Sequence, residues 1–151
     1  MIWGCMKAKG VGYACRIDGR MNAELYTSIL RGEFRQSIRY YDLDPNKLIF
    51  QQDNDPKHTS TLACKWFKDN GIEVLDWPSQ FSDMNPIEHL WVHLKRRLSG
   101  YEKAPSGMLE LWERVEAEWN AIPHEICINL VESMPRRITG VIKAKGGYTK
   151  Y

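Results

Sequence analysis

The amino-acid sequence predicts an α/β protein in which a mixed sheet with flanking helices comes first and an α-helical part follows. Short apolar segments rich in strand-forming residues alternate with amphipathic segments as far as residue 77, and amphipathic segments alone come after them. The chain has 151 residues, of which 43% are hydrophobic, so it is long enough to bury a core and too apolar to be disordered. These observations indicate an ordinary globular domain.

The N-terminal segments are expected to form a β-hairpin and then a helix. Met1–Met6 and Gly12–Ile17 have the composition of short strands, and Lys7-Ala8-Lys9-Gly10 can form the turn between them. Asn22 is a good N-cap for the helix that follows. The apolar face of that helix is expected to carry Tyr26, Leu30, Phe34 and Tyr41.

A strand, a helix and another strand are predicted next. Leu48-Ile49-Phe50 is expected to be a buried strand, and Thr59 or Ser60 can cap the helix after it. Gly71 stands where a glycine commonly ends a helix, and Ile72–Trp77 is expected to be the second strand. The buried face of the helix should carry Ala63, Trp66, Phe67 and Asn70.

Helices are expected throughout the C-terminal half, after a polar loop over residues 79–84. Asn85 as N-cap, Pro86 at the first helical position and Glu88 at the third are typical of a helix start. The apolar stripe of this helix should be Ile87, Leu90, Trp91, Leu94 and Leu98. After a linker over 101–107, a second helix is expected to bury Met108, Leu111, Trp112, Val115, Trp119 and Ile122. A third follows Pro123 and leads into a basic tail.

Composition argues against several classes of protein. Cys5, Cys15, Cys64 and Cys127 are widely spaced without a C-x-x-C pair, which disfavours a thiolate zinc site. An even number of cysteines does not by itself make a disulfide scaffold, and a reducing compartment fits best. No apolar run approaches the roughly 20 residues of a membrane span. The net charge of +2 is too small to require a nucleic-acid partner by itself.

Two acidic residues stand out as candidate metal ligands. Asp53 follows the Leu48–Phe50 strand, and Glu88 stands in the first turn of its helix, with 34 residues between them. A carboxylate at the C-terminal end of a strand suits a hard cation that prefers oxygen ligands. Structural alternatives remain, because the residues after Phe50 are ordinary turn formers and Glu88 can pair with the Asn85 amide in a capping box.

Several motifs resemble a known family. They are Gln51-Gln52-Asp53-Asn54-Asp55-Pro56-Lys57-His58-Thr59-Ser60, Trp77-Pro78-Ser79-Gln80 and Asp83-Met84-Asn85-Pro86-Ile87-Glu88-His89-Leu90-Trp91. With Trp3-Gly4-Cys5 and the ending from Met134-Pro135-Arg136-Arg137 through Lys145-Gly146-Gly147, the sequence resembles the DDE catalytic domain of Tc/mariner superfamily transposases, in their Tc branch, along nearly the whole chain.

The resemblance implies a ribonuclease-H-like fold with an Asp, Asp, Glu triad that holds two magnesium or manganese ions. By motif, Asp53 is the second carboxylate and Glu88 the third. The family's first aspartate lies on a strand before the Trp3-Gly4-Cys5 strand, so we expect a C-terminal fragment whose sheet lacks its first strand. Residues 1–98 would form the truncated core, and residues 99–151 a helical extension of the same domain. We expect such a chain alone to bind metal weakly and to cleave DNA poorly or not at all.

Residues beside the two carboxylates are candidates to support them or to contact DNA. These are Asn54, Asp55, Lys57, His58 and Asn85. For Asp55 and His58 the alternative is a turn that leads into the next helix. Possible phosphate contacts are Lys95, Arg96, Arg136, Arg137, Lys143 and Lys145, for which a solvated basic face is the alternative.

Two other readings of the acidic and histidine residues are less favoured. Asp18 could replace the first aspartate, but it precedes Gly19 in a turn. His89 and His93 could form a zinc pair, but the order Glu-His-x-x-x-His differs from the H-E-x-x-H motif of zinc helices.

The function implied by the resemblance is metal-dependent cleavage and strand transfer in DNA transposition. The expected partners are transposon-end and target DNA, together with a second copy or a full-length transposase, and no membrane. The expected location is intracellular, in the nucleus of a eukaryotic source. The alternative is a non-catalytic DNA-binding or interaction remnant, decayed or adopted by its host.

Overall fold

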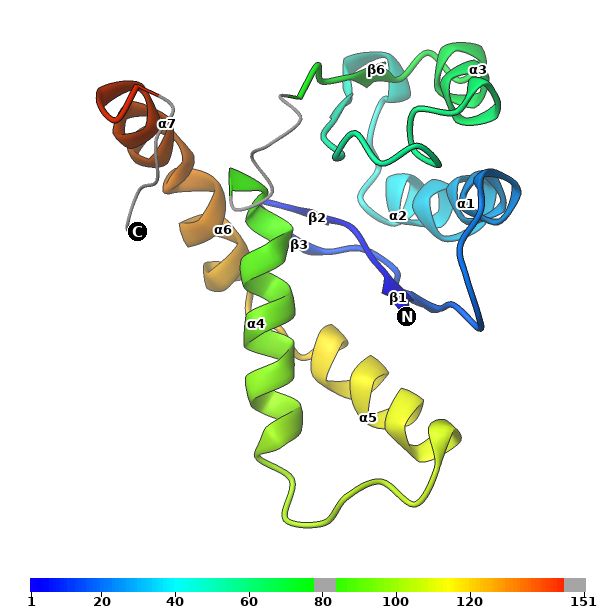
Figure 1. The fold of residues 1–151 in the computed structure, drawn as a ribbon, viewed down its shortest axis with the longest axis vertical. Coiled ribbons are helices and arrows are strands. Elements are labelled where there is room, and N and C mark those ends of the chain that lie inside the picture. Colours follow the sequence, from blue (N-terminus) through cyan, green and yellow to red (C-terminus); the bar gives the residue numbers. More distant parts are fainter. Residues whose placement is uncertain (78–83, 146–151) are drawn as a thin grey trace. The chain divides into compact units, whose positions relative to one another are not determined.

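The computed structural model describes residues 1–77 and 84–145, and the chain divides into two compact units. Unit one comprises Met1–Cys5 and Gly12–Phe81, and unit two comprises Met6–Val11 and Ser82–Tyr151. Figure 1 follows the chain through both units, whose positions relative to one another are not determined. The division of the domain at residues 98 and 99 stays a prediction. Most of the polar loop predicted over 79–84 lies outside the described residues.

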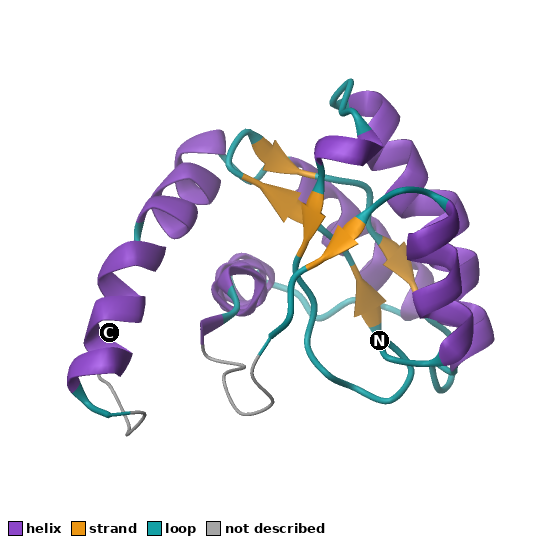
Figure 2. Ribbon diagram, turned by 90° about the horizontal axis from the view of Figure 1, so that it is seen from above, coloured by secondary structure: helices purple, strands orange, loops and turns teal. Residues whose placement is uncertain are grey.

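The predicted N-terminal hairpin is confirmed as two antiparallel strand pairs. In unit one, β1 (Ile2–Trp3) pairs with β4 (Cys15–Arg16), with Trp3 opposite Cys15. In unit two, β2 (Met6–Lys7) pairs with β3 (Gly10–Val11) at the tip of the same hairpin. All the described strands are two residues long, and helices make up most of the chain (Figure 2).

The predicted helix after the hairpin is also confirmed, with a change of pitch in its middle. Three segments follow one another without a break: α1 (Ala23–Ile29), a π-helical turn (Leu30–Phe34) and α2 (Arg35–Tyr40). Asn22 is the N-cap, and its side chain accepts a hydrogen bond of 2.8 Å from the Leu25 amide. The segment buries Tyr26, Ile29, Leu30, Phe34 and Ile38.

The remaining part of unit one is a strand–helix–strand segment. After a 3-10 turn (Pro45–Lys47), β5 (Ile49–Phe50) pairs in parallel with β6 (Glu73–Val74), and α3 (Thr61–Asp69) connects them. Ser60 caps α3, accepting from the Ala63 amide at 3.3 Å. The C-terminal end is formed by Gly71, whose φ of +67° is the left-handed conformation that glycine favours.

The prediction of a buried strand at Leu48–Phe50 is only partly correct. Ile49 is 60% exposed, whereas Phe50 is partly buried and packs against the core. Because successive strand residues point to opposite faces, only one face of this strand meets the core of unit one. The core itself is aromatic: the Phe50 ring lies between those of Phe34 and Phe67, with ring centroids 4.6 Å and 5.2 Å away.

Unit two is built from helices and the hairpin tip. Its helices are α4 (Pro86–Ser99), α5 (Met108–Asn120), α6 (His124–Glu132) and α7 (Met134–Lys143). Within this unit α4 packs against α5 and α6, and α6 packs against β2 and β3. The buried residues include Leu90, Leu94, Val115, Trp119, Ile122 and Cys127, and Trp91 stacks on Trp119 at 4.9 Å. No described helix is both long and apolar enough to cross a membrane.

One predicted core residue of α5 is wrong. Met108 is 60% exposed, because it is the first residue of the helix and the packed face begins one turn later, at Leu111 and Trp112. The helix start is held in another way, through the linker that precedes it.

Arg114 and Glu110 of α5 pin the linker between α4 and α5. The Arg114 guanidinium lies 4.5 Å from the centre of the Tyr101 ring, donates to the Lys103 carbonyl at 2.6 Å and forms an ion pair with Glu110. Glu110 also accepts hydrogen bonds from the Ser106 amide (2.7 Å) and hydroxyl (2.5 Å). The linker is therefore an ordered part of unit two.

Replacement of Gly12 by alanine should destabilise unit one. A Cβ atom there would lie 2.5 Å from both Cys5 Sγ and Ser37 Oγ and 2.9 Å from Ser37 Cβ. Overpacking of this kind costs about 1–3 kcal/mol in the free energy of unfolding. Thermal and urea unfolding of Gly12→Ala measure the loss. The matched control is Gly32→Ala, where a Cβ atom would meet nothing within 4 Å apart from its chain neighbours and its own helix backbone, and helix propensity should leave stability unchanged or raise it by up to ~1 kcal/mol. Equal stability of both variants would contradict the prediction.

The linker contacts should make the stability of unit two depend on pH. Hydrogen bonds from the Ser106 hydroxyl and amide, and then from Arg114, lower the pKa of Glu110 to about 2. A folded-state pKa below the unfolded value stabilises the protein above the unfolded pKa, and that contribution is lost as pH falls from about 4.5 toward 2.

The difference in melting temperature between wild type and Glu110→Gln should therefore be largest near pH 6 and shrink toward pH 2. Glu113→Gln removes an exposed charge from the same helix and serves as the control. A difference that stays constant from pH 6 to pH 2 would show that the ionised Glu110 does not hold the linker.

Candidate functional site

Asp53 lies in the loop that leaves β5, three residues after Phe50. Its side chain is 53% exposed. A hydrogen bond of 2.5 Å joins its Oδ1 atom to Nδ1 of His58, and the Asp55 amide donates to the same oxygen at 3.2 Å. Among the described residues, both hydrogen bonds of Asp53 therefore fall on Oδ1, which leaves Oδ2 for another ligand.

The His58 ring packs against the ring of a buried tyrosine. The rings of Tyr26 and His58 lie 4.4 Å apart, and Tyr26 is 1% exposed. Burial, and then the nearby Asp53 carboxylate, raise the pKa of Tyr26 well above its ordinary value, so its hydroxyl stays protonated and donates to Gln52 Oε1. Gln52 Nε2 in turn donates to the His58 carbonyl at 3.3 Å. Both the ring and the backbone of His58 are thus fixed.

Asp55 and Lys57 are occupied with each other. Lys57 forms an ion pair with Asp55 Oδ2, and its amide donates to Asp55 Oδ1 at 3.1 Å. The hydrogen bond from the Lys57 side chain lowers the pKa of Asp55. Asn54 donates to the carbonyl of Trp77, which ties the loop to the segment after β6. For Asp55 the turn alternative is the one that the geometry supports, although Ser60 and not Asp55 caps α3.

Glu88 lies in unit two, in the first turn of α4. Asn85 is the N-cap, accepting from the Ile87 amide at 3.4 Å, and the Glu88 amide donates to the Asn85 carbonyl at 3.1 Å. The Glu88 residue is exposed. The predicted helix start is confirmed, and it places a carboxylate near the positive end of the helix dipole.

Asp53 and Glu88 belong to different compact units, so their meeting in one pocket stays a prediction. Within residues 1–77 and 84–145, no group of three or more His, Cys, Asp and Glu residues is arranged to hold a metal ion. The donor set still fits a hard cation, because Asp53 offers a carboxylate oxygen without a hydrogen bond from the described residues and Glu88 is exposed.

The two less favoured readings gain no support. Asp18 is exposed and forms an ion pair with Arg16 at 2.9 Å in unit one. His89 and His93 are both partly buried on α4 of unit two, and no third metal-binding side chain joins them among the described residues.

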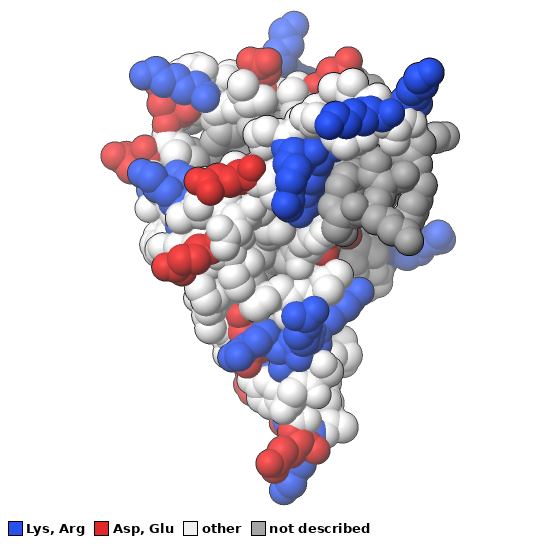
Figure 3. Space-filling model, turned by 90° about the vertical axis from the view of Figure 1, so that its left-hand side faces the viewer, with Lys and Arg blue, Asp and Glu red and all other residues white. Residues whose placement is uncertain are grey.

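Five of the six predicted phosphate contacts are exposed in unit two. They are Lys95, Arg96, Arg136, Lys143 and Lys145. Arg137 is instead 6% exposed, which makes it a poor candidate. On the face drawn in Figure 3, Lys and Arg side chains lie among Asp and Glu side chains. The basic residues on this face do not form a surface of a single sign.

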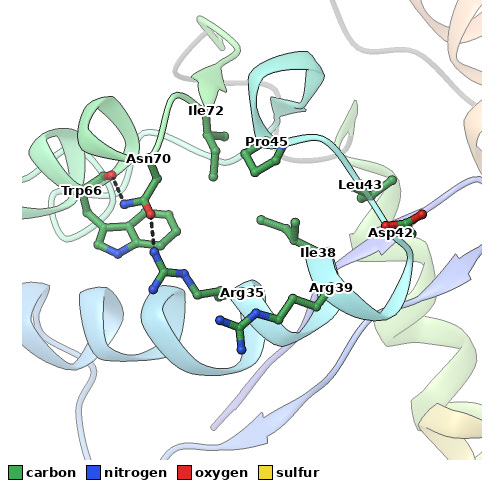
Figure 4. A pocket seen from close by; sticks show the side chains of 9 residues that line it. All are labelled: Arg35, Ile38, Arg39, Asp42, Leu43, Pro45, Trp66, Asn70 and Ile72. Carbon is green, nitrogen blue, oxygen red and sulfur yellow. Dashed lines mark hydrogen bonds between the residues drawn. The ribbon is translucent and has the colours of Figure 1, made fainter.

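A cavity of about 540 Å³ in unit one is lined by residues outside the loop of Asp53, and Figure 4 shows their side chains. Its lining is Ile38, Leu43, Pro45, Trp66 and Ile72 with Arg35, Arg39, Asp42 and Asn70. Arg35 donates to Asn70 Oδ1 at 2.5 Å, and Asn70 donates to the Trp66 carbonyl at 2.7 Å. Asp42 is the one carboxylate among the described residues of this lining, so they offer no carboxylate cluster for a metal.

The sequence did not point to Tyr26 and Gln52 as part of the site. The sequence pattern places Tyr26 on the apolar face of its helix and Gln52 beside Asp53 in the motif. A usable signal was present, since a buried tyrosine hydroxyl normally finds a hydrogen-bond partner.

Comparison with known proteins identifies the family. The family model of the DDE superfamily endonucleases matches residues 1–107, which include Asp53 and Glu88. The Tcb1 transposase of Caenorhabditis briggsae is 43% identical over 151 residues, and the Tc1 transposase of Caenorhabditis elegans is 41% identical over 153. Each match takes in 100% of this chain and 54% of the relative. The chain therefore spans about half the length of these relatives.

Solved structures show the same fold. The Mos1 transposase catalytic domain, in a structure with Raltegravir and Mg, superposes with a TM-score of 0.88 at 21% identity, covering 99% of this chain and 76% of that one. The Mos1 paired-end complex with Mn gives a TM-score of 0.87 at 20% identity, covering 99% and 44%.

Together the family match and the fold show that the chain belongs to the DDE superfamily endonucleases and is a catalytic domain of the Tc/mariner transposase type, with a ribonuclease-H-like fold.

Proposed function

We propose that this chain takes part in cut-and-paste DNA transposition and that Asp53 and Glu88 are two of the carboxylates that hold its divalent metal ions. The observation that carries the proposal is the state of Asp53 at the end of β5. One carboxylate oxygen is held by His58 and the Asp55 amide, and the other has no partner among the described residues. A metal ligand needs such an arrangement, oriented and still free to bind.

Each element supplies one part of the proposed site. β5 brings Asp53 to the C-terminal end of the parallel pair, where ligands of α/β sheets gather. The first turn of α4 presents Glu88, with Asn85 and Pro86 fixing where the helix begins.

Magnesium or manganese is the cofactor that these residues would hold. When bound, two such ions activate a nucleophile and stabilise the leaving oxygen at a phosphodiester. The structures of Mos1 with Mg and with Mn support the choice of ions. The protein's own part is to hold carboxylate oxygens in place, since hard divalent ions need their charge neutralised by oxygen.

A double-variant experiment tests the proposal directly. Titration calorimetry measures Mn²⁺ binding to the 151-residue chain, which we expect to be weak. Asp53→Asn and Glu88→Gln should each weaken Mn²⁺ binding about tenfold or more. The loss of binding free energy in the double variant should be much smaller than the sum of the losses in the two single variants. Asp69→Asn, which removes an exposed carboxylate of α3 paired with Lys65, is the control.

Additive or absent effects of the two variants would contradict the shared site. A plasmid-nicking assay adds a second readout: the 151-residue chain should nick supercoiled DNA weakly or not at all. Robust metal-dependent nicking that Asp53→Ala abolishes would show that two carboxylates suffice.

DNA is the proposed substrate, with transposon ends and target as its sources. Mos1 has been solved as a paired-end complex with the left transposon end and as a strand transfer complex, which supports this choice and the expectation of a second copy or a full-length transposase as partner. Action on DNA would place the protein in the nucleus of a eukaryotic source.

A second candidate function is DNA binding without cleavage, favoured by the five exposed basic residues of unit two. With up to five phosphate contacts, the slope of log K against log salt should reach about −4.5. Anisotropy titrations without metal between 50 and 200 mM salt measure this slope. The double substitution of Lys95 and Arg96 by alanine should reduce its magnitude by about 2, and so should that of Arg136 and Lys143. An unchanged slope would exclude these residues as phosphate contacts.

A further inference from the structure

The proposed function leaves open what aims the Asp53 carboxylate. A side chain that is half exposed and stands on a loop after a strand has several rotamers available. A metal ligand must occupy one of them, and residues that hydrogen-bond to a metal ligand usually provide that restriction. Among the residues that the structure describes, His58 is a side chain placed to do so.

His58 is the donor in its contact with Asp53. A carboxylate can only accept a hydrogen bond, so the 2.5 Å contact places the proton on Nδ1 of His58. The other ring nitrogen, Nε2, is buried and has no hydrogen-bond partner in the described chain. Among the described residues, the imidazole of His58 therefore forms its hydrogen bond through Nδ1, and the acceptor is Asp53.

The ring cannot easily turn away from Asp53. The side chain of His58 is only 14% exposed, and its ring packs at a 44° tilt on Tyr26, which belongs to the core of unit one. The Tyr26 hydroxyl holds Gln52, and Gln52 holds the His58 carbonyl. A path of contacts thus runs from the buried helix α1 to the exposed carboxylate.

We propose that His58 is a positioning residue for metal binding: it holds Oδ1 of Asp53, leaves Oδ2 to take a divalent cation, and is itself fixed by Tyr26 and Gln52. This inference rests on the proposed role of Asp53 as a metal ligand. Of the two functional roles considered for His58, support of Asp53 and contact with DNA, the inference favours the first. A side chain that is buried and hydrogen-bonded to Asp53 is not placed to contact DNA.

Manganese binding to the full 151-residue chain, followed by electron paramagnetic resonance, tests the inference. His58→Phe keeps a ring on Tyr26 and removes the donor, so the dissociation constant for Mn²⁺ should rise about 10–100-fold. Tyr26→Phe keeps the core ring and removes the hydroxyl that holds Gln52, so a smaller rise is expected. His124→Phe, the same replacement at an exposed histidine of unit two, should leave Mn²⁺ binding unchanged.

Two further readouts separate positioning from a purely structural role. The melting temperature of His58→Phe should stay close to that of wild type while affinity falls; a lower melting temperature with intact Mn²⁺ affinity would overturn the inference. Nitrogen-15 spectra of the metal-free chain should show the proton of His58 on Nδ1, and Asp53→Ala should release it toward Nε2. A His58 spectrum that Asp53→Ala leaves unchanged would also overturn the inference.

Asp53→Asn in the same titration separates the role of Asp53 as a metal ligand from the positioning role of His58. If Asp53→Asn loses Mn²⁺ binding and His58→Phe does not, Asp53 remains a metal ligand and the positioning role of His58 is wrong. If Asp53→Asn binds Mn²⁺ as wild type does, the proposed function of Asp53 fails and the role of His58 in metal binding fails with it.

Discussion

The packing of Phe50 between Phe34 and Phe67 is the constraint on which the candidate site depends. The Phe50 ring centroid lies 4.6 Å from that of Phe34 and 5.2 Å from that of Phe67, and the Phe34 and Phe67 centroids are 6.4 Å apart, so Phe50 is packed against the core of unit one. Phe50 is the last residue of β5, so its burial fixes the point where the chain leaves the strand pair. Asp53 follows Phe50 by three residues, so this short connection restricts the positions that the Asp53 backbone can take.

Hydrogen bonds hold the loop that follows β5. The loop from Asp53 to Ser60 is closed by contacts of its own side chains, with Asp53 bonded to His58 and Asp55 to Lys57. The residues at the two ends of this loop have different roles. Ser60 caps α3, whereas Asp53 keeps one carboxylate oxygen without a hydrogen bond from the described residues. Most of the polar groups of the loop stabilise a turn, and one carboxylate oxygen remains for function.

Glu88 depends on a second core. It stands at the start of α4, whose buried face of Leu90 and Leu94 and stacked Trp91 are packed within unit two. Each candidate ligand is thus held by its own set of apolar contacts.

Local sequence signals predicted most helix boundaries and the family. Asn22, Ser60 and Asn85 mark helix starts by cap chemistry, Gly71 marks a helix end, and the motifs around Asp53 and Glu88 identify the transposase domain. These signals are local, so they can be read along the chain. Other features appear only in the folded chain: Ile49 and Met108 are exposed, Arg137 is buried, and the Tyr26 ring packs against His58. Burial and contacts between residues distant in sequence depend on which surfaces meet, and no local pattern specifies that.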